Sequence, residues 1–239
     1  MNSNSTISSL KILLENPEDT NQVFKLVSSL DRKSIKRCYE KLLKSDVGGE
    51  IAYNRKELLE RLSDESWING FEEGTVGWHY NRFIKEEKFS SKELMTIYET
   101  NFSEISKLHP HNWLARHLTN VHDIWHVLTG YGANSMGETA LLAFTFAQTG
   151  SRGALAINIA TTFKILRMKK RKYPFIKIFL EGYTNGKKAS WLLLENYEKM
   201  MREPIEDARK RLNINEPTLY LPFAAKLKKI KRKKSVVLC

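Results

Sequence analysis

Apolar residues recur three or four positions apart along most of the chain, with lysine and glutamate between them. This spacing is the period of an amphipathic helix, and no stretch alternates convincingly between apolar and polar residues as a half-buried strand does. The pattern therefore predicts an all-α fold. The predicted helices cover residues 6–15, 20–30, 32–45, 55–63, 80–86, 91–99, 112–130, 135–148, 153–168, 175–200 and 204–212.

Capping residues predict where several of these helices begin and end. Asp31 is typical of a helix start, and Thr75 is a plausible N-cap for the helix that continues through residues 80–86. Pro110 fits the first turn of a helix, and Gly130 fits the position just after one. The pair Gly48-Gly49 predicts a helix stop.

The chain has 239 residues, which is enough for one main domain with a sizeable core. We expect a helical lead-in over residues 1–65, a helical core domain over residues 66–220 and a disordered basic tail over residues 221–239.

Cysteine is nearly absent, since Cys38 and Cys239 are the only two. No disulfide framework is implied, which indicates a reducing compartment, and a zinc site built on thiolates is excluded.

Residues 1–15 lack the features of a signal or transit peptide, because no basic stretch followed by an apolar run is present. We therefore expect a cytoplasmic protein.

The net charge of +12 is concentrated in two basic runs. Six of the nine residues over 164–172 and seven of the nine over 226–234 are lysine or arginine. Such runs suit nucleic acid, an anionic membrane surface or a phosphate-bearing ligand, although a solvated tail explains the second run equally well. No interleaving of aromatic and basic residues supports nucleic-acid binding.

Two histidines stand one helical turn apart in Val121-His122-Asp123-Ile124-Trp125-His126. Residues four apart project from the same helix face, so both imidazoles can reach one metal ion. Asp123 lies ~100° further round the helix than His122. It can bind the ion directly or orient a histidine.

A fourth ligand is offered by Glu138, in the first turn of the next predicted helix. A tight turn after Gly130 would fold Glu138 back over His126, and Gly137 removes the side chain that could obstruct this approach. A histidine pair alone is as often packed or solvated as it is a metal site. The added acids favour one divalent ion, with zinc expected, and we interpret His79, His109, His111 and His117 as structural or solvated, although His79 could face the site.

The motif His-Asp-x-x-His, eleven residues, Glu, followed by Gln148-Thr149-Gly150, resembles the ubiquinone (coenzyme Q) biosynthesis protein Coq-four family. The resemblance extends to residues 73–77 with Tyr80 and Phe83, to Gly182 and Gly186-Lys187, and to residues 192–197 and 209–214. It covers roughly residues 70–217.

This resemblance implies an all-helical fold and a metal centre at His122, Asp123, His126 and Glu138. It also implies metal-dependent (oxidative) loss of the C1 carboxylate from a 4-hydroxy-polyprenylbenzoate. A further implied role is organisation of the other ubiquinone biosynthesis proteins on a membrane. The expected partners are then a polyprenylated benzoate or quinone intermediate, those proteins and an anionic membrane surface. A homodimer is left open, and nucleic acid is not expected.

The resemblance places the protein on the inner face of the membrane rather than across it. In that position Lys169, Lys170, Arg171 and Lys172 could face anionic headgroups. The apolar stretches 140–146 and 154–163 could form a groove for a prenyl tail, although such stripes are more often core. Both stretches end before the length needed to span a bilayer, because Gln148, Ser151 and Arg152 interrupt them.

Two other functions use the same residues. A scaffold that binds a prenyl lipid and contains a structural metal needs no nucleophile, and no serine, cysteine or lysine stands out as one. A His-Asp phosphohydrolase would need a further histidine upstream and a late aspartate, but Asp207 is the only aspartate after Asp123 and lies in a charged helical stretch.

Overall fold

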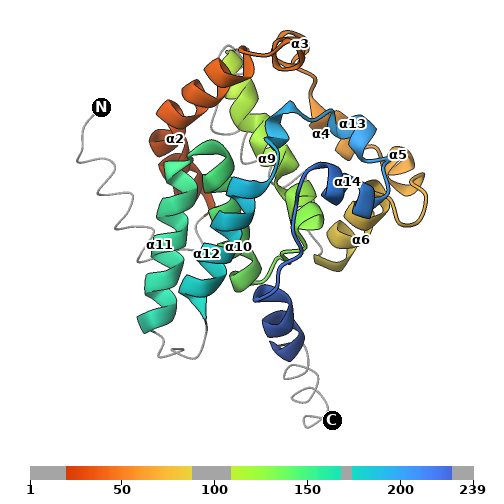
Figure 1. The fold of residues 1–239 in the computed structure, drawn as a ribbon. Helices are drawn as coiled ribbons and strands as arrows, with labels where there is room; N and C mark the ends of the chain where they lie inside the picture. Colours follow the sequence, from red (N-terminus) through yellow and green to blue (C-terminus); the bar gives the residue numbers. More distant parts are fainter. Residues whose placement is uncertain (1–19, 88–108, 168–173, 228–239) are drawn as a thin grey trace.

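The computed structural model describes residues 20–87, 109–167 and 174–227, and for residues 20–29, 87 and 160–167 it describes the backbone alone. Within these ranges the protein is helical and contains no strand, which confirms the predicted all-α fold (Figure 1). The helices are α2 (Thr20–Leu42), α3 (Asp46–Asn54), α4 (Leu58–Leu62), α5 (Glu65–Asn69), α6 (Val76–Glu87), α9 (Pro110–Thr129), α10 (Ser135–Thr149), α11 (Arg152–Arg167), α12 (Phe175–Lys188), the 3₁₀ helix η1 (Leu192–Leu194), α13 (Tyr197–Met200) and α14 (Ile205–Arg211). Residues 220–227 form a further helix.

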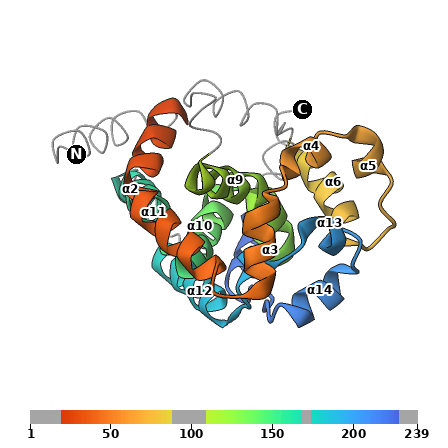
Figure 2. The ribbon, with the colours of Figure 1, turned by 90° about the horizontal axis from the view of Figure 1, so that it is seen from above.

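Helices α9 and α10 lie in the middle of the molecule (Figures 1 and 2). Helices α2, α11 and α12 lie on one side of this pair, and α4 to α6 with α13 and α14 lie on the other. The main core contains fully buried residues of both central helices, including Ile124, Leu128, Leu141 and Phe144. The two helices that carry the predicted ligands are therefore held by packing from both sides. The division into lead-in, core and tail stays a prediction, but residues 221–227, which belong to the predicted disordered tail, are helical.

Helix α12 approaches α10 closely because glycines face it. A Cβ atom on Gly182 would lie 2.1 Å from the Ala140 carbonyl oxygen, and one on Gly186 would lie 2.7 Å from the Phe144 carbonyl oxygen. Both distances are too short for a real side chain, so the two backbones meet directly. This contact fixes α10 along its length.

Several predicted helix ends are confirmed. Thr75 Oγ1 accepts a hydrogen bond from Trp78 N at 3.2 Å, so it caps α6 as predicted. Pro110 occupies the first turn of α9, and Gly130 ends that helix in the left-handed conformation with φ +74°. The expected helices over residues 6–15 and 91–99 lie outside the described residues.

The predicted helix start at Asp31 is wrong, because α2 continues through it. The buried carboxylate of Asp31 instead accepts hydrogen bonds from Ser151 Oγ at 2.6 Å and from Gly153 N at 2.9 Å. These donors lie where α11 begins. Asp31 therefore satisfies the start of a helix that is distant in sequence, which a local pattern does not reveal.

Two further boundaries differ from the prediction. Gly48 and Gly49 lie inside α3, whose N-cap is Ser45, and a Cβ on Gly48 would lie 2.0 Å from the Leu42 carbonyl oxygen. This glycine therefore permits a close approach and does not stop the helix. The single helix expected over residues 175–200 is divided into α12, η1 and α13. Gln148 binds Gly186 O at 2.7 Å and Leu192 N at 3.0 Å, so its side chain supports the chain where the helix is interrupted.

Candidate metal centre

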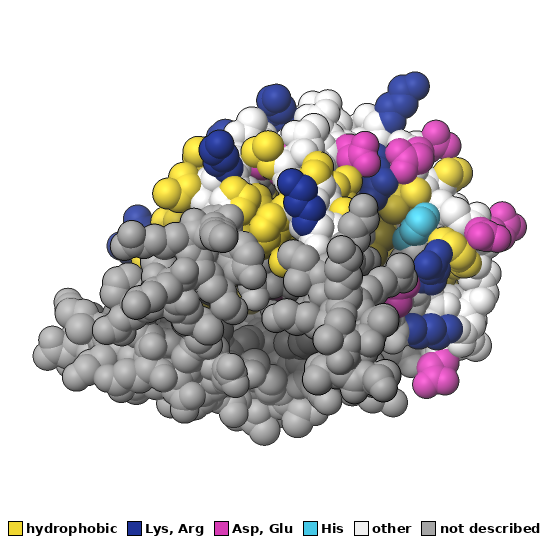
Figure 3. Space-filling model, turned by 90° about the horizontal axis from the view of Figure 1, so that it is seen from below, with side chains coloured by type: hydrophobic (Ala, Val, Ile, Leu, Met, Phe, Trp, Pro, Cys, Tyr) yellow, Lys and Arg dark blue, Asp and Glu magenta, His cyan; other side chains and the backbone are white. Residues whose placement is uncertain are grey.

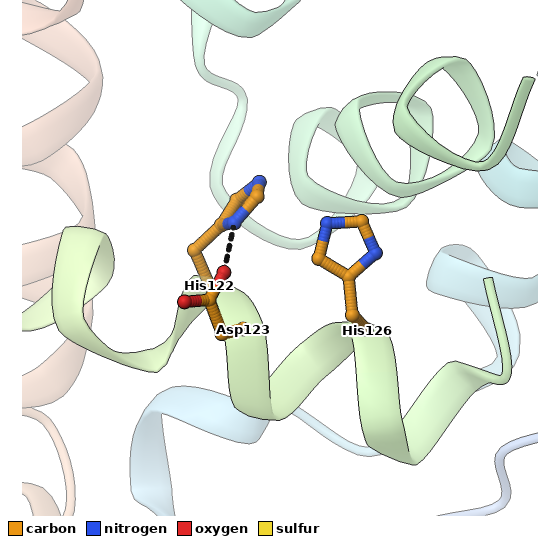
Figure 4. Close-up of side chains that lie close together, drawn as sticks. All are labelled: His122, Asp123 and His126. Atoms are coloured by element: carbon orange, nitrogen blue, oxygen red, sulfur yellow. Dashed lines mark hydrogen bonds and ion pairs between the residues drawn. The ribbon is translucent and has the colours of Figure 1, made fainter. Parts of the chain in front are cut away.

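Helix α9 presents His122 and His126 on the same side, as their spacing predicts (Figure 4). Their ring centroids lie 4.8 Å apart, and the rings are nearly perpendicular, at 82°. His122, Asp123 and His126 each offer one ligand atom within 4.8 Å of the others, so they form a group that could hold a metal ion.

Glu138 joins this group from the first turn of α10. Its Oε1 atom lies 3.1 Å from His126 Nε2, and its Oε2 atom lies 3.7 Å from His122 Nε2. The turn thus folds Glu138 back over His126, but Gly137 is needed for a reason other than the one expected. A Cβ there would lie 1.8 Å from the carbonyl oxygen of Gly132, so glycine lets the first turn of α10 lie against the preceding loop.

Each histidine is held through the ring nitrogen that faces away from Glu138. His122 Nδ1 lies 3.2 Å from Asp123 Oδ1, and His126 Nδ1 lies 2.7 Å from the carbonyl oxygen of Tyr131. Both partners are acceptors, which assigns a proton to each Nδ1 atom. The two Nε2 atoms, which are left to act as acceptors, both face the Glu138 carboxylate.

This arrangement fits a cation. A neutral imidazole nitrogen and a carboxylate oxygen are both acceptors, so their approach needs a proton or a metal ion between them. Two ligand atoms at ~2.0–2.1 Å from a tetrahedral zinc ion stand roughly 3.3 Å apart. The distances of 3.1 Å and 3.7 Å from Glu138 to the two Nε2 atoms lie on either side of that value.

Asp123 occupies the position of an orienting residue, since it faces His122 Nδ1 rather than Nε2. A carboxylate in this position fixes the ring and raises the basicity of the ligating nitrogen. Direct binding of the ion by Asp123 stays a prediction, as do the ligand roles of His122, His126 and Glu138.

The charges within the group stabilise one another. Burial lowers the pKa of His122, but the hydrogen bond to Asp123 and the charge of Glu138 outweigh it, so the pKa lies above its ordinary value. Burial raises the pKa of Glu138, but His126 and His122 together reverse this effect and leave that pKa below its ordinary value. The carboxylate is therefore kept ionised, which is the state that binds a cation.

An aromatic residue of α6 covers one side of the group. The Phe83 ring stacks on His126 with a centroid distance of 5.2 Å, and the side chain of His126 is only 1% exposed. The side chains of His122 and Glu138 are 30% and 36% exposed. The group is thus closed behind His126 and open beside the other two residues.

The other histidines do not join the group among the residues that the structure describes. His79 packs edge-on to Trp78, and the charges nearest its ring include Arg209 and Arg82. The rings of His109 and His111 meet edge to face at the start of α9, with their centroids 4.9 Å apart. The predicted membrane-facing residues lie outside the described ranges; they are Lys169, Lys170, Arg171 and Lys172.

Most of the apolar part of α10 packs into the core, whereas Leu142 and Phe146 are half-buried, and the groove for a prenyl tail stays a prediction. Ala140, Leu141, Ala143 and Phe144 are completely buried, and α12 packs along this helix. The side chains of residues 160–163, in the second apolar stretch, lie outside the described part. None of the helices that the structure describes has an apolar stretch long enough to cross a membrane.

Sequence reasoning did not identify the backbone carbonyl of Tyr131 as the partner of His126, because every residue type carries such a carbonyl. It also gave Phe83 no role at the ligands, since its helix is distant from α9 in sequence. The resemblance of Tyr80 and Phe83 to a family pattern was the only available signal.

Comparison with known proteins identifies the family. The model of the family "Coenzyme Q (ubiquinone) biosynthesis protein Coq4" matches residues 3–218. The chain belongs to the Coq4 family. As a Coq4 family member it is a ubiquinone biosynthesis protein, and this confirms the resemblance on which the sequence analysis relied.

The curated Coq4 relatives are distant but extend over most of the chain. The mitochondrial ubiquinone biosynthesis protein COQ4 homolog of Danio rerio is 25% identical over 210 residues, which is 87% of this chain and 74% of the relative. The homolog of Homo sapiens, also named mitochondrial, is 22% identical over 89% of this chain and 78% of its own length. A crystal structure of a putative ubiquinone biosynthesis protein from Nostoc punctiforme PCC 73102 superposes with a TM-score of 0.68. It is 20% identical and covers 90% of this chain and 99% of the solved chain, so the fold is shared.

Proposed function

We propose that this Coq4 family member removes the C1 carboxylate from a 4-hydroxy-polyprenylbenzoate, using one divalent metal ion, with zinc expected. The observation that carries this proposal is the convergence of two imidazole Nε2 atoms and the Glu138 carboxylate on one partly open place. Structural zinc sites have all four positions filled by protein, whereas catalytic sites leave one open. The exposure of His122 and Glu138 favours the second kind.

The protein's residues would perform separate tasks in this reaction. His122, His126 and Glu138 would hold the ion, while Asp123 and the Tyr131 carbonyl would keep the protons on the Nδ1 atoms. When bound, the ion supplies Lewis acidity, which withdraws electron density from substrate oxygens. In a simple decarboxylation the bond between the ring and its carboxylate breaks, carbon dioxide leaves, and a proton takes its place on the ring. In an oxidative one, molecular oxygen would be needed to supply the hydroxyl group at that position.

Metal content tests the first part of the proposal. Elemental analysis should find about one equivalent of metal in the purified protein and none in a His122→Ala, His126→Ala double variant. A His79→Ala, His111→Ala double variant is the matched control, because it also removes two histidines but should keep the metal. Equal metal content in all three proteins, or none in any of them after incubation with zinc, would refute the site.

A substrate assay tests the second part. The metal-loaded protein should release carbon dioxide from a prenylated 4-hydroxybenzoate, and Glu138→Gln should abolish the release. The mass of the product distinguishes hydrogen from hydroxyl at the former carboxylate position, and therefore a simple from an oxidative decarboxylation. Bound metal without any release would reject the lyase and favour the scaffold with a structural metal.

We also propose that the chain works on an anionic membrane surface, where it organises other ubiquinone biosynthesis proteins. Helix α12 exposes Ile176 and Leu180, at 71% and 52%, with the exposed Lys177 beside them. Figure 3 shows hydrophobic and basic side chains together over the part of this face where α11 and α12 lie. Apolar groups flanked by lysine suit an interface with lipid headgroups.

Vesicle binding tests this surface. Neutralising Lys169, Lys170, Arg171 and Lys172 should weaken binding to vesicles that contain anionic lipid. The matched control replaces four exposed lysines outside α12 with glutamine, namely Lys44, Lys85, Lys199 and Lys210. Equal binding by the wild type and both variants would refute a role for the first cluster.

A further inference from the structure

Glu181 of α12 anchors residues 218–220, which lie about 40 residues further along the chain. The Oε1 atom of this carboxylate accepts hydrogen bonds from Thr218 Oγ1 at 3.1 Å and from Leu219 N at 2.6 Å. Its Oε2 atom accepts one from Tyr220 N at 3.1 Å. These three donors lie where the helix over residues 220–227 begins. Glu181 thus fixes the backbone position of Tyr220 relative to α12.

The Tyr220 side chain extends from this anchor to the loop between α9 and α10. Its hydroxyl oxygen accepts hydrogen bonds from Gly132 N at 2.9 Å and from Asn134 Nδ2 at 2.6 Å. The ring meets Tyr131 edge-on, with a centroid distance of 5.5 Å, and the residue is 2% exposed. A Cβ on Gly132 would lie 2.8 Å from the hydroxyl oxygen, so glycine leaves the room that this contact needs.

The loop between α9 and α10 orients His126 on one side and caps the helix that carries Glu138 on the other. The carbonyl group of Tyr131 orients His126, as described above. The Oδ1 atom of Asn134 accepts hydrogen bonds from Met136 N at 3.1 Å and Gly137 N at 3.2 Å, and so caps the helix that carries Glu138. Tyr220 therefore holds the loop at the residue after Tyr131 and at the capping residue itself.

We infer that Tyr220 is a positioning residue for the metal centre, because its hydroxyl group fixes the loop that orients His126 and starts the helix of Glu138. The hydroxyl group, rather than the ring, carries this role. Tyr220→Phe would keep the contact with the Tyr131 ring and leave Gly132 N and the Asn134 amide without this acceptor. The consequence for metal affinity rests on the proposed function, whereas the consequence for loop geometry does not.

Hydrogen exchange on the metal-free protein tests the geometry. In Tyr220→Phe, exchange of the Met136 and Gly137 amides should accelerate about tenfold or more, although both amides donate to Asn134 Oδ1 and not to the Tyr220 hydroxyl. The proton on His126 Nδ1, followed by NMR, should also exchange faster. A general loss of stability would accelerate core amides such as Leu141 as well, so the ratio of loop to core exchange isolates the positioning effect.

Ser34→Ala is the matched control. Ser34 Oγ donates to Gly150 O at 2.7 Å, so this variant removes a buried hydroxyl that holds the loop at the opposite end of α10. It should leave exchange at Met136 and Gly137 unchanged relative to the core. If Tyr220→Phe does not fold, Glu181→Gln loosens the same anchor and should give the same pattern.

Metal titration then completes the test. With zinc, Tyr220→Phe should raise the Kd about 10- to 100-fold, the usual range for loss of a residue that orients a ligand. A wild-type protein that binds no metal would refute the proposed function, and the exchange data would still decide the positioning role. Unchanged loop exchange and an unchanged His126 signal in Tyr220→Phe would overturn the inference.

Discussion

His117 should make the stability of this protein depend on pH in a way that one substitution removes. The ring stacks on Trp113 and meets Tyr197 edge-on, each at a centroid distance of 5.4 Å. Both ring nitrogens are buried, and neither has a hydrogen-bond partner in the structure as described. Burial lowers the pKa of His117 from 6.5 to about 4, because the charged ring would lose its hydration without gaining a partner.

The size and sign of the effect follow from this pKa. The unfolded chain protonates His117 below pH 6.5, whereas the folded protein keeps it neutral down to about pH 4. Protons therefore favour the unfolded state between these values, and the free energy of unfolding falls as the pH falls. The loss that His117 causes amounts to about 2 kcal/mol at pH 5 and about 3 kcal/mol at pH 4.

His117→Phe should remove this loss while keeping the ring contacts. Urea unfolding of the metal-free proteins at pH 7.5 and pH 5 measures the effect as a difference between variant and wild type. The variant should gain about 2 kcal/mol relative to the wild type over this change in pH. His111→Phe is the control, because His111 is only partly buried and should give a smaller change. A difference between His117→Phe and wild type that is the same at both pH values would refute the reasoning.

For four other substitutions the structure determines the direction of the expected result. Zinc at 100 times its Kd should stabilise the wild type by about 2.7 kcal/mol. Glu138→Gln should lose most of this stabilisation, measured by thermal unfolding. An equal gain in both proteins would contradict the role of Glu138 as a ligand. Gly49→Ala should stabilise the protein by about 1 kcal/mol, since open space surrounds this helical position. Gly182→Ala should instead destabilise it by about 1–3 kcal/mol, because the new methyl group would clash with the Ala140 carbonyl. Denaturant midpoints in the opposite order would contradict this packing. Arg209→Met should cost about 1–3 kcal/mol, because the guanidinium donates to two carbonyls at the end of α9, and an unchanged unfolding free energy would show that water replaces it.

The part of the site that sequence could predict is the part carried by one helix. The four-residue spacing of His122 and His126 determines that their rings share a face, and Pro110 and Gly130 mark the ends of the helix. Glu138 could be added because only a short turn separates it from that helix. Local geometry decides all of these features, so they needed no knowledge of the fold.

Long-range contacts decide the features that sequence reasoning missed. Asp31 looks like a helix start, yet its carboxylate binds the first turn of α11. The helix expected over residues 175–200 is interrupted where Gln148 of α10 supports the chain. The orientation of His126 depends on a backbone carbonyl, and Tyr220, which holds the loop in place, is 88 residues from Gly132. A pattern of residue types does not encode these partners.

The start of α6 has a consequence for how the protein forms during synthesis. The first amide groups of α6 donate to carbonyls of residues that are synthesised much later. Val76 N donates to Glu203 O at 2.9 Å, and Gly77 N donates to Met201 O at 2.8 Å. In the same place, Ile205 N donates to Gly74 O at 3.0 Å. Until residues 201–205 have left the ribosome, the first amides of α6 lack their final hydrogen-bond partners. A nascent chain therefore contains all three proposed ligands before the helix that carries Phe83 has the final hydrogen bonds at its start.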